Sequence, residues 1–304
     1  MNCVTQRAPV IARALFRGGV RKMAACMLLV TAGAPTLVAQ AGPATEAPIA
    51  APSVSVDNRL YDALLQAYVV DGRVNYDGFA RDSRFPQYLA VLNAVNPERL
   101  VEPERLAYWL NVYNAYVIQL IVTHNERTSI RNINRTFGIL RLKGPWSEPL
   151  VRAAGRVLTL DDVAHRILRT EFHDPRIHFA MVNAALGSPP LRSEAYRGAM
   201  LEQQLFDQGR RFLRESPWNN TVDSARFELS VIFDAYRQDF GGTLKALGTS
   251  LGPWFEGPAR QKIEAGRLFF TRREFDWSLN STARPVTSGV SLSSSVTPSS
   301  IRRF

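Results

Sequence analysis

The sequence predicts an α+β fold: one helix-rich domain with a small, mostly antiparallel sheet. Two observations lead to this fold class. Residues 103–124 carry a long apolar stripe at helical spacing, and several short apolar segments elsewhere are typical of strands. Residues 56–280 contain no internal repeat and no linker-like stretch, so we expect them to form a single domain.

The strongest helix signal lies in residues 103–124. Apolar side chains recur there every three or four residues, and few charges interrupt them after Arg105. A stripe this broad predicts a helix buried at the centre of the domain. Its apolar positions are Leu106, Trp109, Leu110, Tyr113, Val117, Leu120 and Ile121.

The remaining elements are predicted from periodicity and from their flanking residues. Helical spacing predicts helices over 58–69, 85–93, 162–168, 194–213 and 230–240. Short apolar runs predict extended segments over 74–76, 156–159, 177–182, 226–229, 268–270 and 275–277. Asp161 and Asp162 favour a helix start, because carboxylates are stabilised at the positive end of the helix dipole.

The first 41 residues have the features of a signal peptide. Basic residues without any acidic one precede an apolar run, and Ala39-Gln40-Ala41 supplies the small-x-small cleavage pattern. We therefore expect a periplasmic or secreted protein. Residues 42–55 are expected to be a disordered linker and residues 281–304 a disordered tail, because neither stretch has apolar periodicity.

Both cysteines, Cys3 and Cys26, fall in the predicted signal peptide. The mature chain would then contain no thiol, which excludes disulfides, thiolate metal sites and a cysteine nucleophile. The histidines His165, His173 and His178 lack the spacing of a metal-binding motif, and the glycines form no phosphate-binding loop. We therefore expect no metal and no cofactor.

Charge and hydropathy exclude two further classes of partner. The formal charge of +10 falls to +5 without the five basic residues of the signal peptide, and no basic run is interleaved with aromatic residues. We expect no nucleic-acid partner. No segment after the signal peptide approaches the roughly 18 uninterrupted apolar residues of a membrane helix, so we expect no membrane span.

Four separated blocks carry a resemblance to a known family. They read AYWLNVYNAY at 107–116, LTLDDVAHRILR at 158–169, DPRIHFAMVNAALGSPPLRSEAY at 174–196 and FDWSLN at 275–280. In order and spacing the chain resembles the domain of unknown function 547 family over 56–280, with the core motifs in 98–207. The resemblance implies a papain-like or transglutaminase-like scaffold, and a Cys-His hydrolase or transferase site where the cysteine is kept.

The chain departs from this family at the expected nucleophile. Members commonly read N-C-A-S-x-G-C-P where this sequence has Asn183 and Ser188 in place of the two cysteines. A serine cannot persist as an anion at neutral pH and needs a general base. Ser188 has three interpretations: a turn residue whose hydroxyl bonds a local backbone N–H, a degenerate ligand site, or an active nucleophile. The first is favoured.

Other polar residues are candidates for the same site. His178, in a predicted strand, is the candidate base, with a buried core histidine as its alternative. His165 follows Asp161 and Asp162 at helical spacing, so it could be oriented by a carboxylate or belong to an ordinary capped helix. A further group consists of Asn111 and Asn114, which could join neighbouring loops or polarise a substrate carbonyl, and Glu148, a loop acid that could complete a site.

Two classes of function follow. The first is a hydrolase or transferase acting on an amide or peptide, with Ser188 as nucleophile, His178 as base and an orienting residue such as Asn183. The second is a non-catalytic binding or envelope protein that keeps the family scaffold and binds a small peptide or amide-containing ligand; a protein partner is not indicated. The missing cysteine favours the second class.

Overall fold

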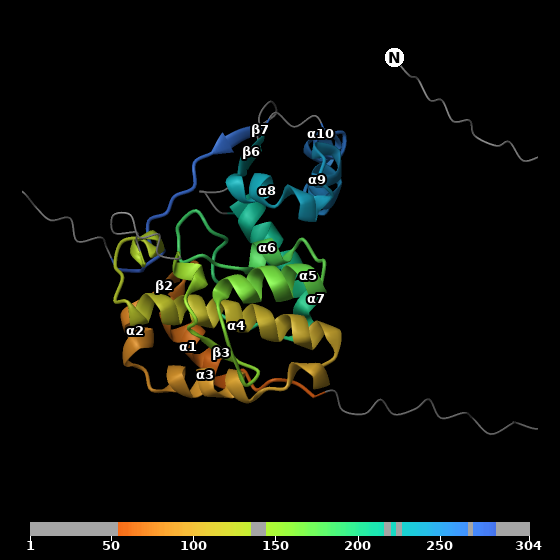
Figure 1. Cartoon of the computed structure of the whole chain (residues 1–304). Helices are drawn as coiled ribbons and strands as arrows, with labels where there is room; N and C mark the ends of the chain where they lie inside the picture. The colour runs from red at the N-terminus through yellow and green to blue at the C-terminus, as the bar shows by residue number, and fades with distance from the viewer. Residues whose placement is uncertain (1–53, 135–143, 216–219, 223–226, 267–269, 284–304) are drawn as a thin grey trace, which may run out of the picture. The chain divides into compact units, whose positions relative to one another are not determined.

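A computed structural model describes residues 54–134, 144–215, 220–222, 227–266 and 270–283. All of them belong to one compact unit, Ala50–Phe304. The predicted signal peptide, nearly all of the linker and most of the tail lie outside the described residues. Within them, many helices accompany short strands, which confirms the α+β class (Figure 1).

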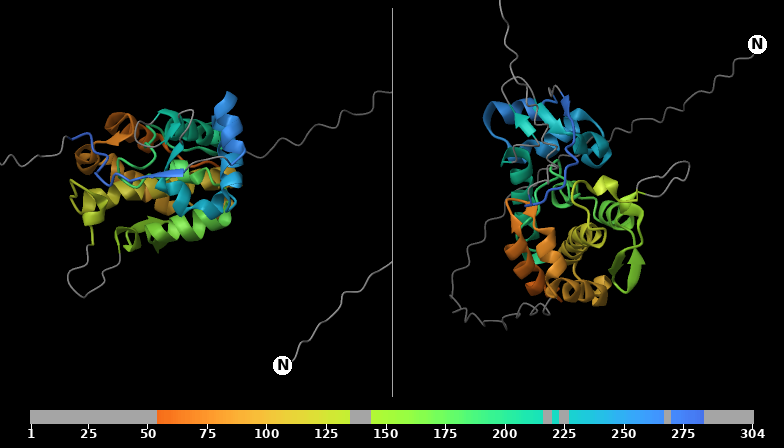
Figure 2. Two further views of the ribbon diagram at one scale, coloured as in Figure 1. Left: turned by 90° about the horizontal axis from the view of Figure 1, so that it is seen from above. Right: turned by 90° about the vertical axis from the view of Figure 1, so that its left-hand side faces the viewer.

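Helix α4, Glu102–Thr123, lies at the centre of the first hydrophobic core, as predicted. All residues from 106 to 121 except Gln119 are buried. A helix that is apolar on every side must be covered on every side. Figure 2, right, looks nearly along α4 and shows the N-terminal helices on one side and the following hairpin and helix on the other.

The N-terminal elements pack against one side of α4. They are α1 Arg59–Tyr68, β1 Val69–Val70, β2 Arg73–Val74, α2 Tyr76–Arg81 and α3 Arg84–Ala94. Asp71 and Gly72 join β1 to β2, and both have positive φ (51° and 80°), as a type I′ hairpin turn requires. The extended segment predicted over 74–76 ends early, because the Asn75 side chain accepts a hydrogen bond from Gly78 N (2.9 Å) and begins α2.

A hairpin and a helix cover another side of α4. Strands β3, Val151–Ala153, and β4, Arg156–Leu158, are antiparallel, and the π-helix η4, Asp162–Leu168, continues into α5, Arg169–Glu171. Thr159 N donates to Asp162 Oδ2 (3.0 Å), and Asp162 N donates to Thr159 Oγ1 (3.0 Å). This reciprocal pair caps the helix start and confirms the predicted strand-to-helix junction.

The strand predicted over 177–182 is wrong: this segment begins with a short helix, α6, Ile177–Ala180. Ile177, Ala180 and Met181 belong to the first core, whereas Phe179 belongs to a second core. Residues i, i+3 and i+4 share one face of a helix, so one helical turn serves both cores. Four residues are too few for this periodicity to be distinguished from a buried strand in the sequence.

The elements that follow α6 complete the first core and build most of the second. They are η5 Gly198–Met200, α7 Leu201–Arg210, η6 Arg211–Glu215, β5 Asn220–Val222, β6 Phe227–Ser230, α8 Val231–Ala235, η7 Arg237–Phe240, α9 Leu244–Leu251, η8 Gly252–Trp254, α10 Gly257–Glu264 and β7 Phe270–Arg273. Strand β6 pairs antiparallel with β5 and parallel with β7. The second core consists of Phe179, Phe212, Leu213, Leu229, Ile232, Phe233, Phe240, Leu247, Leu251, Trp254, Phe255 and Ile263.

Two other predicted elements need correction in this half, and two helices were not expected from the sequence. The helix predicted over 194–213 begins only at Gly198, with η5, because the Asn111 side chain binds both the N–H and the carbonyl of Tyr196. Residues 275–277 form no strand: the main chain of Asp276 binds the turn at Gly187 instead. Helices α9 and α10 were not predicted. Ser281, in the predicted tail, pairs with Val74.

Replacement of Gly248 by alanine tests the packing of α9 against α10. A Cβ on Gly248 would lie 1.8 Å from the Ile263 carbonyl oxygen, so the two helices must separate. We expect Gly248→Ala to lower the free energy of unfolding by about 2 kcal/mol in urea denaturation, although alanine usually stabilises a helix. Gly144→Ala is the control, because its Cβ would meet open space. Equal stability of both variants would contradict this packing.

Candidate functional site

Asn114 determines the path of the chain after α6. Its Nδ2 donates to the Ala180 carbonyl (2.9 Å) and its Oδ1 accepts from Val182 N (3.0 Å). Asn111, one turn earlier on α4, binds Tyr196 in the same two-sided way (2.8 and 2.9 Å). Both carboxamides therefore connect the central helix to the main chain of the segment that contains the candidate nucleophile.

The turn at Ser188 is held by its own neighbours and by residues 276–280. Ser188 Oγ accepts from Asn183 N (2.9 Å), the local hydroxyl-to-backbone bond considered above, and the residue is 3% exposed. Gly187 N donates to the Asp276 carbonyl (2.9 Å), and a Cβ on Gly187 would lie 2.8 Å from Asp276 N. The close approach of these two chains therefore requires glycine at 187.

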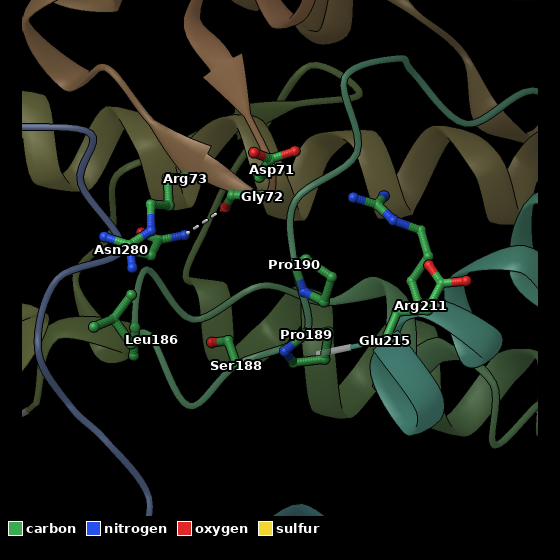
Figure 3. A pocket seen from close by; sticks show the side chains of 11 residues that line it. Asp71, Gly72, Arg73, Leu186, Ser188, Pro189, Pro190, Arg211, Glu215 and Asn280 are labelled. Carbon is green, nitrogen blue, oxygen red and sulfur yellow. Dashed lines mark hydrogen bonds between the residues drawn. The ribbon is translucent and has the colours of Figure 1, made fainter. Parts of the chain in front are cut away.

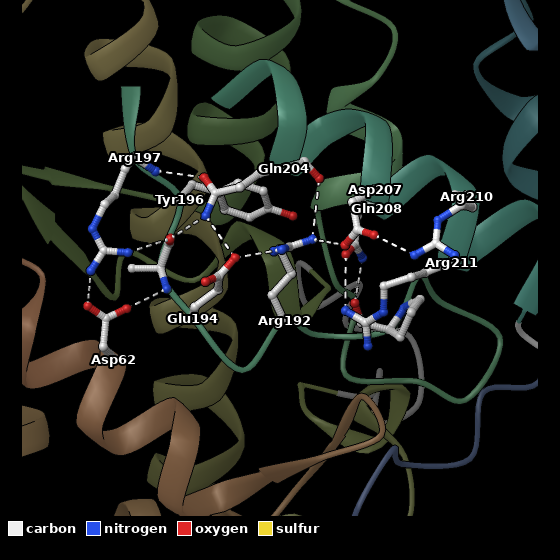
Figure 4. Close-up of polar contacts among 12 residues, drawn as sticks. Asp62, Arg192, Glu194, Tyr196, Arg197, Gln204, Asp207, Gln208, Arg210 and Arg211 are labelled. Carbon is white, nitrogen blue, oxygen red and sulfur yellow. Dashed lines mark hydrogen bonds and ion pairs between the residues drawn. The ribbon is translucent and has the colours of Figure 1, made fainter. Parts of the chain in front are cut away.

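A polar network anchors the end of this turn to α7. Gln208, which is fully buried, donates from Nε2 to the Pro190 carbonyl (2.6 Å). Arg192 forms ion pairs with Glu194 (2.6 Å) and Asp207 (2.7 Å), and Figure 4 shows these side chains in one row along α7. The turn and the helix are thus held in one fixed arrangement.

Ser188 lines a cavity of about 530 Å³, which we call the serine cavity (Figure 3). Its described lining contains no histidine; its charged groups belong to two acids and two arginines. The lining residues are Asp71, Gly72, Arg73, Ala185, Leu186, Ser188, Pro189, Pro190, Arg211, Glu215 and Asn280.

His178 and Asn183 line a different cavity of about 240 Å³, which we call the aromatic cavity. Elements from both cores contribute to it: α4, η4, α6 and the region around α8. Four aromatic rings form much of its wall. The lining residues are Tyr113, Trp146, Asp161, Ala164, His165, His178, Met181, Asn183, Ile232, Tyr236 and Trp277.

His178 is fixed by a carboxylate and by an aromatic ring. Its Nε2 lies 2.7 Å from Asp239 Oδ2, and its ring stacks on Tyr236 with centroids 4.1 Å apart. Burial lowers the pKa of His178 from 6.5 to about 4, an effect that the hydrogen bond to Asp239 only partly opposes. The ring is therefore neutral at pH 7 with its proton on Nε2, so Nδ1 is the basic nitrogen.

Arg169 connects this pair to the second histidine of the aromatic cavity. Its guanidinium binds both oxygens of Asp239 (2.6 and 2.7 Å), which lowers the pKa of that carboxyl group. A third contact joins Arg169 Nη1 to His165 Nδ1 (3.1 Å). A guanidinium can only donate, so His165 Nδ1 accepts, and its Nε2–H points toward Asp161 (3.9 Å).

Asn183 occupies one of the two family cysteine positions, and the structure places it beside Tyr113. The Tyr113 hydroxyl donates to Asn183 Oδ1 (2.8 Å). This bond orients the carboxamide and assigns its nitrogen the role of donor. An amide in this place can bind a carbonyl oxygen but cannot act as a nucleophile.

The structure thus divides the predicted site residues. His165, His178 and Asn183 meet in the aromatic cavity, Ser188 lines the serine cavity, and Asn111, Asn114 and Glu148 line neither. Glu148 instead binds His124 Nε2 (2.8 Å) and Asn134 Nδ2 (3.0 Å).

Sequence reasoning did not identify Asp239, Arg169 or Tyr236. Asp239 lies 61 residues after the histidine that it binds, and no local pattern marks the pair. Asp239 falls in the helix predicted over 230–240, but the apolar spacing that predicts this helix carries no information about a partner of His178.

Residues 97–213 match the family model described as "Protein of unknown function, DUF547". This region belongs to the DUF547 family. No curated protein and no solved structure matches the chain. The DUF547 match contains Tyr113, Trp146, Asp161, His165, His178 and Asn183, which are most of the polar and aromatic lining of the aromatic cavity.

The DUF547 match ends before the aromatic cavity is complete. Four residues after position 213 complete the site: Ile232, Tyr236 and Trp277 line the cavity, and Asp239 orients His178.

Neither a metal-binding cluster nor a membrane-spanning helix is found in the described part of the chain. It contains no cluster of three or more His, Cys, Asp or Glu side chains able to hold a metal ion, and none of its helices has the length and apolar character to cross a membrane.

The depressed pKa of His178 predicts a pH-dependent stability. Between its ordinary pKa of 6.5 and about 4, the unfolded state binds more protons than the folded state, so stability falls as pH is lowered through this window. The contribution is about 3 kcal/mol at most. Urea denaturation between pH 7.5 and 4.5 measures it.

His178→Gln is the matched variant for this experiment. Its side-chain amide keeps a donor for Asp239 and does not titrate, so its stability should decrease less between pH 6.5 and 4.5. If the variant does not fold, NMR titration of the His178 ring in the wild-type protein gives the same answer. A ring that titrates at pH 6.5 would contradict the prediction.

Proposed function

We propose that this chain is an exported, non-catalytic protein that binds a small peptide or amide-containing ligand in the aromatic cavity. One observation carries the proposal: Ser188 and His178, the candidate nucleophile and base, line different cavities. The Ser188 hydroxyl already accepts a backbone hydrogen bond from Asn183. The basic lead, apolar run and Ala39-Gln40-Ala41 site support export to the periplasm or the medium.

The composition of the aromatic cavity supports ligand binding. Small-molecule sites are typically concave, mostly apolar or aromatic, and contain a few polar groups at fixed positions. Here Asn183 supplies amide donors, His178 Nδ1 supplies an acceptor, and the rings supply apolar surface. An amide group has one donor and one acceptor, so it can satisfy both polar groups.

Removal of one aromatic wall tests ligand binding. We expect Trp146→Leu to weaken the binding of N-acetyl amino acid N-methylamides about tenfold, because a large aromatic contact is lost. Tryptophan fluorescence follows binding through Trp277, which also lines the cavity. Ser188→Ala is the control and should bind as the wild-type protein does. Loss of binding in Ser188→Ala with retention in Trp146→Leu would assign the ligand to the serine cavity.

One observation favours hydrolysis as a second candidate function. His178 and Asp239 have the arrangement of a general base and the carboxylate that orients it. The enzyme would act on an amide or peptide with Ser188 as nucleophile, as considered from the sequence. This requires Ser188 to reach His178 from the neighbouring cavity.

Engineered thiols distinguish the two functions. In a Cys3→Ser, Cys26→Ser background, we expect Ser188→Cys to react with iodoacetamide no faster than free cysteine at pH 7, because the described lining of its cavity contains no histidine. Asn183→Cys is the comparison, because its thiol would share a cavity with His178. Tenfold acceleration at Ser188→Cys, or hydrolysis of amide substrates that Ser188→Ala abolishes, would favour the hydrolase.

A further inference from the structure

We infer that the aromatic cavity binds a ligand that carries an ammonium group, with Asp161 as the counter-ion. This inference rests on the ligand-binding function proposed above and specifies the ligand's charge. It is based on the distribution of charge around the cavity, the hydrogen bonds of Asp161 and the rings that surround it.

The described lining of the aromatic cavity carries a single carboxylate and no lysine or arginine. That carboxylate is Asp161. Asp239 is not part of this lining: it binds His178, and its negative charge is neutralised by Arg169, which donates to both of its carboxylate oxygens. The fixed charge that faces the cavity is therefore negative.

The two histidines do not cancel this charge. His178 is buried, and its single proton on Nε2 is directed to Asp239. His165 accepts from Arg169 through Nδ1, and an imidazolium would place a second N–H against the guanidinium there. The contact between His165 Nε2 and Asp161 Oδ1, at 3.9 Å, is too long for a hydrogen bond.

Asp161 retains acceptor capacity. Its Oδ2 accepts from the Ser147 hydroxyl (2.6 Å), whereas its Oδ1 is 3.9 Å from His165 Nε2, which is too long for a hydrogen bond. The side chain is 44% exposed. An ammonium group, which has only donors, is the natural partner for such an oxygen.

The aromatic rings favour the same charge. Arg131 lies over Trp277 (5.3 Å from the ring centroid) and Arg169 over Tyr236 (5.0 Å), so two of the rings already stabilise cations. Trp146 meets Trp277 edge to face at 6.0 Å and forms a corner of the cavity. A volume of about 240 Å³ suits one amino-acid side chain or a small amine.

A pair of similar ligands tests the inference on the full-length protein. N-acetyl-lysine N-methylamide and N-acetyl-norleucine N-methylamide share the amide groups, but only the first carries an ammonium. We expect the lysine derivative to bind at least about tenfold more tightly in fluorescence titrations, and its advantage to decrease with salt. It should also shift the indole N–H signals of Trp146 and Trp277 in NMR spectra.

Asp161→Asn should abolish this preference, measured as the ratio of the two ligands' affinities. Asparagine keeps an acceptor for Ser147, and Asp57→Asn removes the same charge from an exposed pair with Arg59 outside the cavity. Equal binding of both ligands to the wild-type protein would overturn the inference but not the proposed function. Binding of neither would overturn both, and a preference that survives Asp161→Asn would overturn the role of Asp161.

Discussion

The hydrogen bonds of the Asn114 side chain determine the arrangement of both cavities. They bind the carbonyl of Ala180 and the N–H of Val182, so they end α6 and turn the chain away from the helix. A buried carboxamide that lost these partners would leave polar groups unsatisfied in the core, at a cost of several kcal/mol. With these two hydrogen bonds in place, His178 and Asn183 line the aromatic cavity. Ser188, five residues after Asn183, lines the serine cavity.

The second constraint is the compensation of charge around His178. Asp239 accepts hydrogen bonds from both Arg169 and His178. The ring of Tyr236 stacks on His178, and the Arg169 guanidinium lies over the same ring. The arginine keeps the carboxylate ionised, and the carboxylate fixes the imidazole tautomer. The arrangement holds His178 neutral and in a defined orientation. A histidine held in this way can accept a hydrogen bond from a ligand as well as it can act as a base.

The sequence predicted the elements in which an apolar pattern continues over many residues. It did not predict the short elements whose conformation is set by tertiary contacts. Helix α4 was evident because its apolar stripe, Leu106 to Ile121, spans about four turns. Helix α6 was not, because four residues that face two cores have the same apolar pattern as a strand. The family resemblance implied one cleft for Ser188 and His178, but the bonds that separate them come from Asn114 on α4 and from residues 276–280. Asp239 could not be found at all, since nothing local connects it to His178.

The aromatic cavity lies where the two hydrophobic cores meet. Tyr113 and Met181 reach it from one side, Ile232 and Tyr236 from the other, and only the docked arrangement brings all four together. A ligand that fills it must therefore favour the docked state over any state in which the C-terminal half has separated, by an amount set by ligand concentration and affinity. Ligand occupancy of the cavity and cohesion of the domain are then thermodynamically linked, so a partner that binds the C-terminal helices more tightly in one of the two states would change the affinity of the cavity.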